Sequence, residues 1–342
     1  MLLEQLLARN LLPDALVRWG IRRRLRGVLR EQGAPDIETA QARLTDFLSH
    51  MDSAPIALNT ADSRQQHYEV PAAFFTAVLG PHLKYSSALW EPGTEALAAA
   101  ERAMLERTCE RAELDDGQRV LDLGCGWGSF SLFAAQRYPG SHITAVSHSH
   151  SQRAFIERAA AERGLDNLTV VTQDANALNL EGPFDRIVSV EMFEHMRNHR
   201  KLLAQLAELL TPGGKLFIHI FTHRELAYLY NAEDPAEWMA RHFFTGGMMP
   251  SRWLLFHFQD VLRVERHWTV DGRHYERTLN AWLARMDGAR ESLWPLFERT
   301  YGTEQARLWW MRWRVFFMAC AELFGYRGGS EWFVSHYRLV RA

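Results

Sequence analysis

Two carboxylates and an imidazole lie within five residues in the segment EMFEH at 191–195. An apolar, strand-like run ends at Val190, so this segment begins a loop or a helix directly after a strand. Ionisable groups this close together perturb one another's pKa values and can hold a proton or a cation beside a reacting centre. We therefore expect Glu191, Glu194 and His195 to be catalytic. Helix capping by Glu191 is the structural alternative, and we expect no metal site because no third cluster supplies ligands.

The segment VLDLGCGWG at 120–128 joins a short apolar strand to a glycine-rich turn. Glycines at alternate positions let the backbone approach a ligand without a Cβ in the way, and the following helix presents free N–H groups. The spacing is not the G-x-G-x-x-G of pyrophosphate binders. It favours a ligand whose amino-acid-like tail lies on Gly124 and Gly126, such as S-adenosylmethionine. A purely structural turn is the alternative.

Two further strand ends offer polar groups to the same ligand. Ser147 and Gln152 lie about 20 residues past the glycines, where a nicotinamide enzyme carries an acid for the ribose. Because that acid is missing, a dehydrogenase is disfavoured. Asp174 can accept a hydrogen bond from an adenine amino group, although helix capping explains Ser147 and Asp174 equally well. His219, near a later strand end, faces the same crevice or is a structural histidine.

The elements that position these residues can be predicted from hydrophobic patterning. From residue 118 the chain alternates strand-like and helix-like segments, which predicts a parallel sheet covered by helices on both faces. The predicted strands are 118–123, 142–147, 168–172, 184–190 and 214–221, followed by β-like runs at about 258–270 and 331–340. Ligands of such sheets bind at the carboxyl ends of the strands, where all of these polar residues lie.

We expect an N-terminal helical region at 1–60 and one α/β domain at 61–342, with its core sheet at about 118–222. Helical insertions are predicted at about 225–255 and 276–328. Nine of the 12 tryptophans follow residue 237, which suits either a core or a pocket for a flat or cationic ligand. The arginine-rich helix near residue 22 is interpreted as a solvated helix paired with local acids, with an anionic membrane surface as the alternative.

Bulk properties narrow the range of partners. The 342 residues carry a formal net charge of −2, so no global field points to nucleic acid. Three cysteines are too few for a disulfide framework. No apolar run reaches the roughly 18 residues that span a bilayer, and the N-terminus does not resemble a signal peptide. We expect a cytoplasmic protein with at most peripheral membrane contact, and a homodimer stays open.

Together these features resemble the cyclopropane-fatty-acid synthase superfamily of S-adenosylmethionine-dependent methyltransferases, and within it the coclaurine N-methyltransferase branch. The similarity extends over nearly the whole chain. It is carried by QHYEVP at 66–71, LKYS at 83–86, the glycine turn, 184–196, FFTGG at 243–247, HY at 274–275, and AELFGY at 321–326 through EW at 331–332. The resemblance implies a class I methyltransferase fold, which is an α/β, Rossmann-like, seven-stranded and mostly parallel sheet with N-terminal helices and a helical insertion over the acceptor.

The resemblance also implies roles for individual residues. The residues that it implies for the cofactor site are Tyr68, Ser86, Gly124, Gly126, Gln152, Asp174 and Ala175. To these we add Ser147 and Val190, which lie at the ends of two predicted strands. The expected acceptor side comprises the catalytic Glu69, Glu191, Glu194 and His195, with a pocket made by His219, Tyr275, Phe324 and Trp332.

One departure concerns ring formation. Cyclopropane synthases of this superfamily hold a bicarbonate that removes a proton from a carbocation, and here Glu194, His219 and Tyr275 match its holders. Ser87 replaces a cysteine and Phe221 replaces an isoleucine. The larger Phe221 would crowd the ion, which makes bicarbonate a doubtful cofactor.

These arguments predict methyl transfer from S-adenosylmethionine to the nitrogen of a small hydrophobic, alkaloid-like amine, with S-adenosylhomocysteine as the product. The alternative is methylation or cyclopropanation of an unsaturated lipid acyl chain. A non-catalytic cofactor-binding protein is disfavoured by the dense acidic and imidazole cluster at 191–195.

Overall fold

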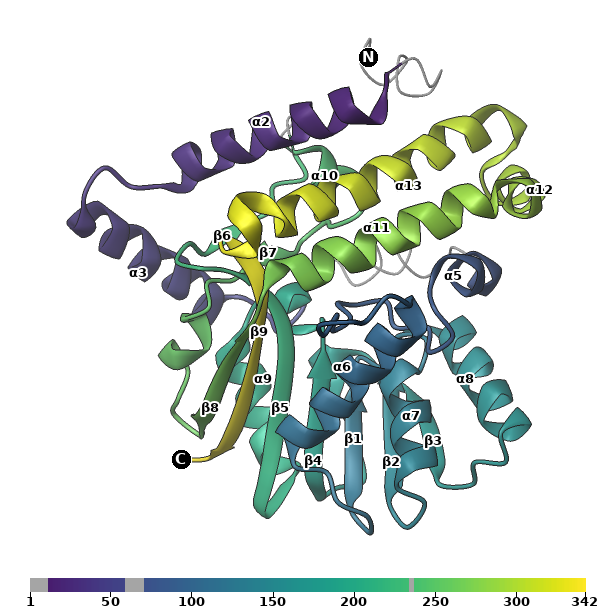
Figure 1. Cartoon of the computed structure of the whole chain (residues 1–342). Coiled ribbons are helices and arrows are strands. Elements are labelled where there is room, and N and C mark those ends of the chain that lie inside the picture. Colours follow the sequence, from purple (N-terminus) through teal and green to yellow (C-terminus); the bar gives the residue numbers. More distant parts are fainter. Residues whose placement is uncertain (1–11, 59–70, 234–236) are drawn as a thin grey trace.

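The computed structural model describes residues 12–58, 71–233 and 237–342. A seven-stranded sheet in the order β3-β2-β1-β4-β5-β9-β8 forms its centre (Figure 1). Its strands are β1 (Arg119–Leu123), β2 (His142–Ser147), β3 (Leu168–Thr172), β4 (Phe184–Val190), β5 (Leu210–His223), β8 (Leu262–Val270) and β9 (Trp332–Arg341). The first five are parallel, whereas β9 runs antiparallel to both β5 and β8. The predicted fold class and all seven predicted strands are confirmed.

Helices cover both faces of the sheet because the strands are apolar on both sides. In β1, Val120 packs with residues of α6 (Leu97–Ala112) and α7 (Ser129–Arg137). The alternate residues Leu121 and Leu123 pack on the other face, toward α9 (His199–Glu208). The helix α8 (His150–Glu162) lies beside α7 and packs on β2 and β3.

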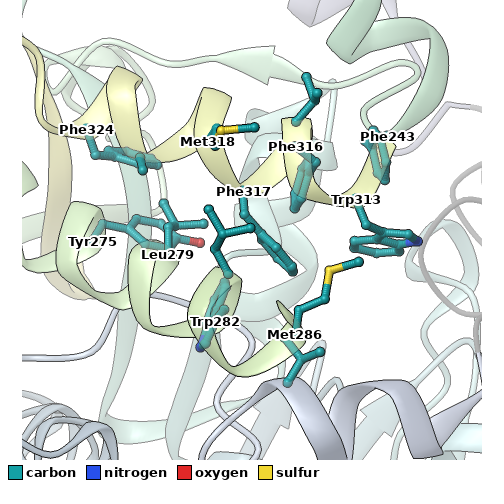
Figure 2. Packing of buried hydrophobic residues seen from close by; sticks show 14 of the residues in the cluster. Phe243, Tyr275, Leu279, Trp282, Met286, Trp313, Phe316, Phe317, Met318 and Phe324 are labelled. Atoms are coloured by element: carbon teal, nitrogen blue, oxygen red, sulfur yellow. The ribbon is translucent and has the colours of Figure 1, made fainter. Parts of the chain in front are cut away.

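A helical layer lies over the edge of the sheet where the parallel strands end (Figure 1). It consists of α2 (Asp14–Gln32), α5 (Ala72–Val78), α11 (Gly272–Gly288), α12 (Arg290–Tyr301) and α13 (Thr303–Phe324), while α3 (Ile37–Ser53) continues from α2 toward α9. The segment predicted as a helical insertion at about 276–328 is therefore helical. Figure 2 shows its packing, in which Trp282 and Phe317 meet between α11 and α13.

The prediction of a helical insertion at about 225–255 is wrong, because most of the described part of this segment is not helical. It contains one short helix, α10 (Trp238–His242), and a 3-10 turn at Leu254–His257. Two short strands, β6 (Tyr228–Leu229) and β7 (Met248–Met249), pair as a ribbon. The two glycines at 246–247 and Pro250 explain the error, because both residue types interrupt a helix whatever the hydrophobic pattern around them.

The arginine-rich helix α2 is tied to α13 by ion pairs. Arg18 and Arg22 both contact Glu322, at 3.0 and 2.7 Å, and Arg314 binds Asp14 at 2.7 Å. Arginines of α2 are thus paired with acids as interpreted, but the acid shared by Arg18 and Arg22 is distant in sequence, whereas Arg24 pairs with Glu31 of its own helix at 2.8 Å. Within the described ranges, the structure contains no helix that is both long and apolar enough to cross a bilayer.

Candidate active site

A cavity of about 990 Å³ lies at the carboxyl ends of β1 and β4, under α2, α11 and α13. A second cavity of about 90 Å³ adjoins it, and both are lined by Gly124, Glu191 and His195. Together they extend past the ends of β2 and β3. Sites of this size bind cofactors and drug-sized ligands. The topology thus brings the predicted residues of four strand ends to one place.

The glycine turn after β1 has backbone conformations that other residues rarely adopt. Gly124 and Gly126 have φ values of +86° and +53°. A Cβ at Gly124 would approach the Met192 side chain to 2.8 Å, whereas a Cβ at Gly126 would meet no atom within 4 Å. Gly126 therefore presents bare backbone to the open cavity, as a ligand lying on the turn requires.

Unpaired polar atoms surround this turn. Among the described residues, Gln152 Nε2 and Ser129 Oγ are buried and have no hydrogen-bond partner, and both side chains line the large cavity. Gln152 Oε1 accepts the hydroxyl of Ser147 at 2.7 Å, which turns the amide N–H groups away from Ser147. A buried donor without a partner is costly, so these two groups suit a polar ligand.

Two buried ionisable groups at this end were missed by the sequence predictions. Lys84 Nζ donates to Ser86 Oγ at 2.5 Å, and burial lowers the pKa of Lys84 to about 8 despite the nearby carboxylate of Glu191. Burial raises the pKa of Asp122 to about 7, while Ser131 donates to its carboxylate. Lys84 lies in the LKYS segment, and its place between apolar neighbours was the available signal.

The smaller cavity contains the other predicted cofactor residues. Ser147, Asp174 and Ala175 line it, whereas Val190 lines the large cavity. Ser147 is not the cap of α8, because Ser149 accepts the N–H that a cap satisfies. Asp174 does cap the 3-10 turn that begins at Ala175, since its side chain accepts from a backbone N–H at 2.8 Å. Capping and ligand contact are compatible for this residue.

Glu191 is held by three donors at the end of β4. Its Oε1 accepts the backbone N–H of Ser87 at 3.2 Å and faces Nε2 of His219 at 3.3 Å, and its Oε2 accepts the hydroxyl of Tyr275 at 2.5 Å. The 3-10 turn that follows has Met192 at its N-cap position and no side-chain cap hydrogen bond, so the capping alternative for Glu191 is wrong. Burial raises the pKa of Glu191 to about 7, which the Tyr275 hydrogen bond and the charge of Lys84 oppose.

Glu194 and His195 follow in a 3-10 turn and face the same cavity. The carboxyl of Glu194 is buried, and its Oε2 has no hydrogen-bond partner among the described residues. Burial, reinforced by the charge of Glu191, raises the pKa of Glu194 well above its ordinary value. The ring of His195 lies 4.5 Å from that of Phe244. Three of the four predicted catalytic groups, Glu191, Glu194 and His195, therefore line one side of the cavity, which we call the acidic wall.

Aromatic rings line the cavity next to these acidic residues. Tyr275 and Phe324 stack at 4.3 Å with an angle of 20°, and Figure 2 shows them facing each other from α11 and α13. Phe221 lies 6.1 Å from Phe324 and also lines the cavity. Such a surface accommodates flat or cationic groups.

Two predicted pocket residues lie one layer behind the wall. Trp332 is buried and donates to the hydroxyl of Tyr228, which is the residue that lines the cavity. His219 is likewise buried behind Glu191. Both residues lie on inner strands of the sheet. Trp332 supports Tyr228 and His219 supports Glu191, and these partners are the residues that line the cavity. Tyr68 and Glu69 lie outside the described residues.

The groups expected to hold bicarbonate do not fit that ion. Tyr275 and His219 direct their polar atoms at the Glu191 carboxylate, as does the N–H of Ser87. A second anion among these donors would face a carboxylate at the same point and would be repelled. The Glu191 carboxylate thus occupies the hydrogen-bond donors that bicarbonate would need. We therefore assign bicarbonate no part in the reaction.

Comparison with known proteins agrees with this geometry. The family model of mycolic acid cyclopropane synthetase matches residues 57–329. The (S)-coclaurine N-methyltransferase of Thalictrum flavum subsp. glaucum is 37% identical over 96% of this chain and 92% of its own length. The pavine N-methyltransferase of the same plant is 32% identical over 88% and 85%. The crystal structure of a coclaurine N-methyltransferase bound to N-methylheliamine and SAH is 34% identical, has a TM-score of 0.95 and covers 98% of each chain.

Proposed function

Because this chain belongs to the mycolic acid cyclopropane synthetase family, we propose that it is an S-adenosylmethionine-dependent methyltransferase whose acceptor is the nitrogen of a small hydrophobic amine. Its similarity to alkaloid N-methyltransferases along nearly the whole chain supports this function. The observation that carries it is the Glu194 carboxyl, which is buried, lacks a partner at Oε2 among the described residues, and faces a cavity with aromatic walls. An amine supplies both the N–H and the positive charge that this carboxylate needs.

The residues around the glycine turn suit the cofactor. The backbone of Gly124 and Gly126 would lie under its amino-acid tail, and the free amide of Gln152 would donate to its carboxylate. Lys84 adds a positive charge near Ser86 at the same end. Asp174, in the smaller cavity, would accept a hydrogen bond from the amino group of the adenine. When bound, the cofactor supplies an electrophilic methyl group on a sulfonium sulfur.

The acidic wall would manage the proton and charge of the amine. An amine that enters as an ammonium ion gives its proton to Glu194 or His195, which leaves a lone pair free to attack the methyl carbon. As the N–C bond forms and the S–C bond breaks, positive charge moves to the nitrogen. The raised pKa of Glu194 makes its carboxylate a stronger base than an exposed one.

The surrounding side chains would orient the amine without reacting. Glu191, held by Tyr275 and His219, offers a fixed negative charge to the cationic nitrogen. The stacked rings of Tyr275 and Phe324 offer π faces to the same charge. Holding the two reactants in line is itself a large part of such catalysis. The apolar remainder of the cavity limits the acceptor to hydrophobic amines.

The proposal can be tested by labelling with a methyl-deuterated cofactor. The purified protein is given either a panel of hydrophobic secondary amines that includes heliamine, or vesicles of unsaturated phospholipid. Amine methylation leaves three deuterons in the product, whereas cyclopropanation leaves two. We expect labelled amine and no labelled lipid in mass spectrometry. Labelled lipid with no labelled amine would overturn the proposal.

Location and assembly are separate proposals. All three cysteines are free thiols, and Cys109 and Cys125 are buried. This supports a reducing compartment such as the cytoplasm. The homodimer stays a prediction.

A further inference from the structure

A row of hydrogen-bonded side chains runs from Glu191 across the sheet. His219 on β5 and His336 on β9 are register partners, and His336 Nε2 lies 2.9 Å from His219 Nδ1. His336 Nδ1 in turn lies 2.8 Å from Nη1 of Arg111, in the last turn of α6. The guanidinium carbon of Arg111 is 5.0 Å from the centre of the Trp268 ring, which is next to His336 in the β8–β9 register. Thus Arg111, two imidazoles and Glu191 form one continuous chain.

The direction of every hydrogen bond in this row follows from Arg111, the member farthest from Glu191. Arginine donates and has no acceptor atom, so His336 Nδ1 must be the unprotonated nitrogen. His336 then carries its hydrogen on Nε2 and donates to Nδ1 of His219. His219 consequently carries its hydrogen on Nε2, which is the atom that faces Glu191 Oε1 at 3.3 Å.

The electrostatics of the row agree with neutral imidazoles. Both histidines are fully buried. Burial, together with the nearby charges of Lys84 and Arg111, holds the pKa of His219 well below its ordinary value. Burial and the neighbouring His219 and Arg111 do the same for His336. Burial lowers the pKa of Arg111 to about 10, so Arg111 is the cation of the row at neutral pH.

We propose that Arg111 is a positioning residue for catalysis, because its donor-only guanidinium selects the tautomers of His336 and His219 and so directs an N–H at the Glu191 carboxylate. This inference rests on the role of Glu191 in amine methylation. Without Arg111 the row can reverse, with a protonated Glu191 donating to His219 and each imidazole donating outward. Arg111 therefore favours the ionised form of a side chain that it does not touch.

The same geometry excludes the row as a path for the proton of the amine. A proton that left Glu191 through His219 and His336 would arrive at the N–H of Arg111, which cannot accept it. The proton must leave from the cavity side, where Glu194 and His195 are located. The row therefore favours the ionised form of Glu191 but does not conduct protons away from it.

Other groups also act on Glu191 and must be held constant in any test. They come from each element packed around it: Lys84 on the segment after α5, Glu194 on the turn after β4, His219 on β5, Tyr275 on α11 and Cys320 on α13. None of them is altered by substitutions in α6.

Two different substitutions of Arg111 separate its effect on hydrogen-bond direction from its effect on packing. In Arg111→Gln the amide can accept a hydrogen bond, which releases the tautomers, whereas Arg111→Lys remains a pure donor. We expect the acid limb of kcat/KM against pH to move up by about one unit in Arg111→Gln. A limb at about 7 that moves to about 8 gives a loss of about fivefold at pH 7 and none at pH 9.5. Arg111→Lys should stay close to the parent profile.

The matched control is Arg102→Met, which removes an arginine from an exposed ion pair on the same helix and should leave the profile unchanged. An Arg111→Gln profile equal to that of Arg102→Met in a folded protein would overturn the proposal. So would an equal loss at every pH, which indicates a purely structural role.

A spectroscopic measurement makes the test independent of activity. Nitrogen NMR of protein labelled with ¹⁵N-histidine reports which ring nitrogen carries hydrogen, and His336→Phe assigns the signals by difference. We expect Nε2–H on both His219 and His336 in the unsubstituted protein and a mixture in Arg111→Gln. Nδ1–H at either histidine of the unsubstituted protein would refute the inference, even if Arg111→Gln failed to fold. Absence of any amine methylation would instead refute the proposed function and leave this result standing.

Discussion

Tyr275 donates its hydroxyl to Oε2 of Glu191 at 2.5 Å, a contact that joins the first turns of α11 to the end of β4. The contact links the helical layer to the sheet at the reacting centre. It also sets the charge of the acidic wall, because a hydrogen bond to a carboxylate favours its ionised form.

The first prediction concerns pH. Burial raises the pKa of Glu191 to about 7, so this carboxyl is protonated below that pH and ionised above it. Activity that needs the carboxylate should therefore fall as pH decreases through about 7. Tyr275→Phe removes a bond that lowers the pKa, so the acid limb of kcat/KM should move upward by about one unit. Stopped assays with mass-spectrometric detection between pH 5.5 and 9.5 would measure it.

The control is Tyr326→Phe, which removes a hydroxyl from the 3-10 turn after α13, at a residue that is not among those lining the large cavity. Its profile should match the parent. A limb that stays in place in Tyr275→Phe would show that Glu191 is not the titrating group.

The second prediction separates chemistry from binding at Glu194. Glu194→Gln keeps the shape of the side chain and removes its basicity, so kcat should fall by about 10²- to 10⁴-fold. Because the carboxyl faces the acceptor side, the calorimetric Kd for S-adenosylhomocysteine should change less than about threefold (0.7 kcal/mol). A similar loss of turnover and of cofactor affinity would instead indicate a structural role.

The third prediction concerns the glycine turn. Gly126→Ala places a methyl group where the cofactor is expected and strains the backbone, so cofactor affinity should fall by about tenfold or more. Gly117→Ala is the matched control, because Gly117 has a φ of +86° and equally open space around its Cα. It precedes β1 at the opposite end of the strand. Each variant should lose about 1–2 kcal/mol of stability, and only Gly126→Ala should lose affinity in calorimetry.

The fourth prediction concerns α2 as the cover of the cavity. Glu322 pairs with Arg18 and Arg22 of α2, and α2 residues such as Val17 and Ile21 line the cavity. Glu322→Ala removes both pairs, each worth about 0.5 kcal/mol. The KM for the amine should therefore rise about three- to fivefold, with little change in cofactor affinity.

A change of the same type at Glu157 tests whether this effect is local. Glu157 forms an exposed i,i+4 pair with Arg153 on α8, and Glu157→Ala should leave both constants unchanged. An unaltered KM in Glu322→Ala would contradict a covering role for the α2 contacts.

The amino-acid sequence by itself determined those features that depend on near neighbours. Alternating apolar runs predicted the seven strands, and the glycine spacing predicted the turn, because both follow from backbone conformation and side-chain period. Glu191, Glu194 and His195 were recognised as a group because they are adjacent along the chain.

Only the tertiary structure decided the partners of these groups. His219 and His336 are 117 residues apart and Arg111 and His336 are 225 apart, and no local pattern specifies the β5–β9 register that joins them. The buried setting of Lys84 and the place of Trp332 behind Tyr228 depend on the same long-range packing. Side-chain charge and tautomer are set by what lies around a group in space, and chain connectivity alone does not carry that information.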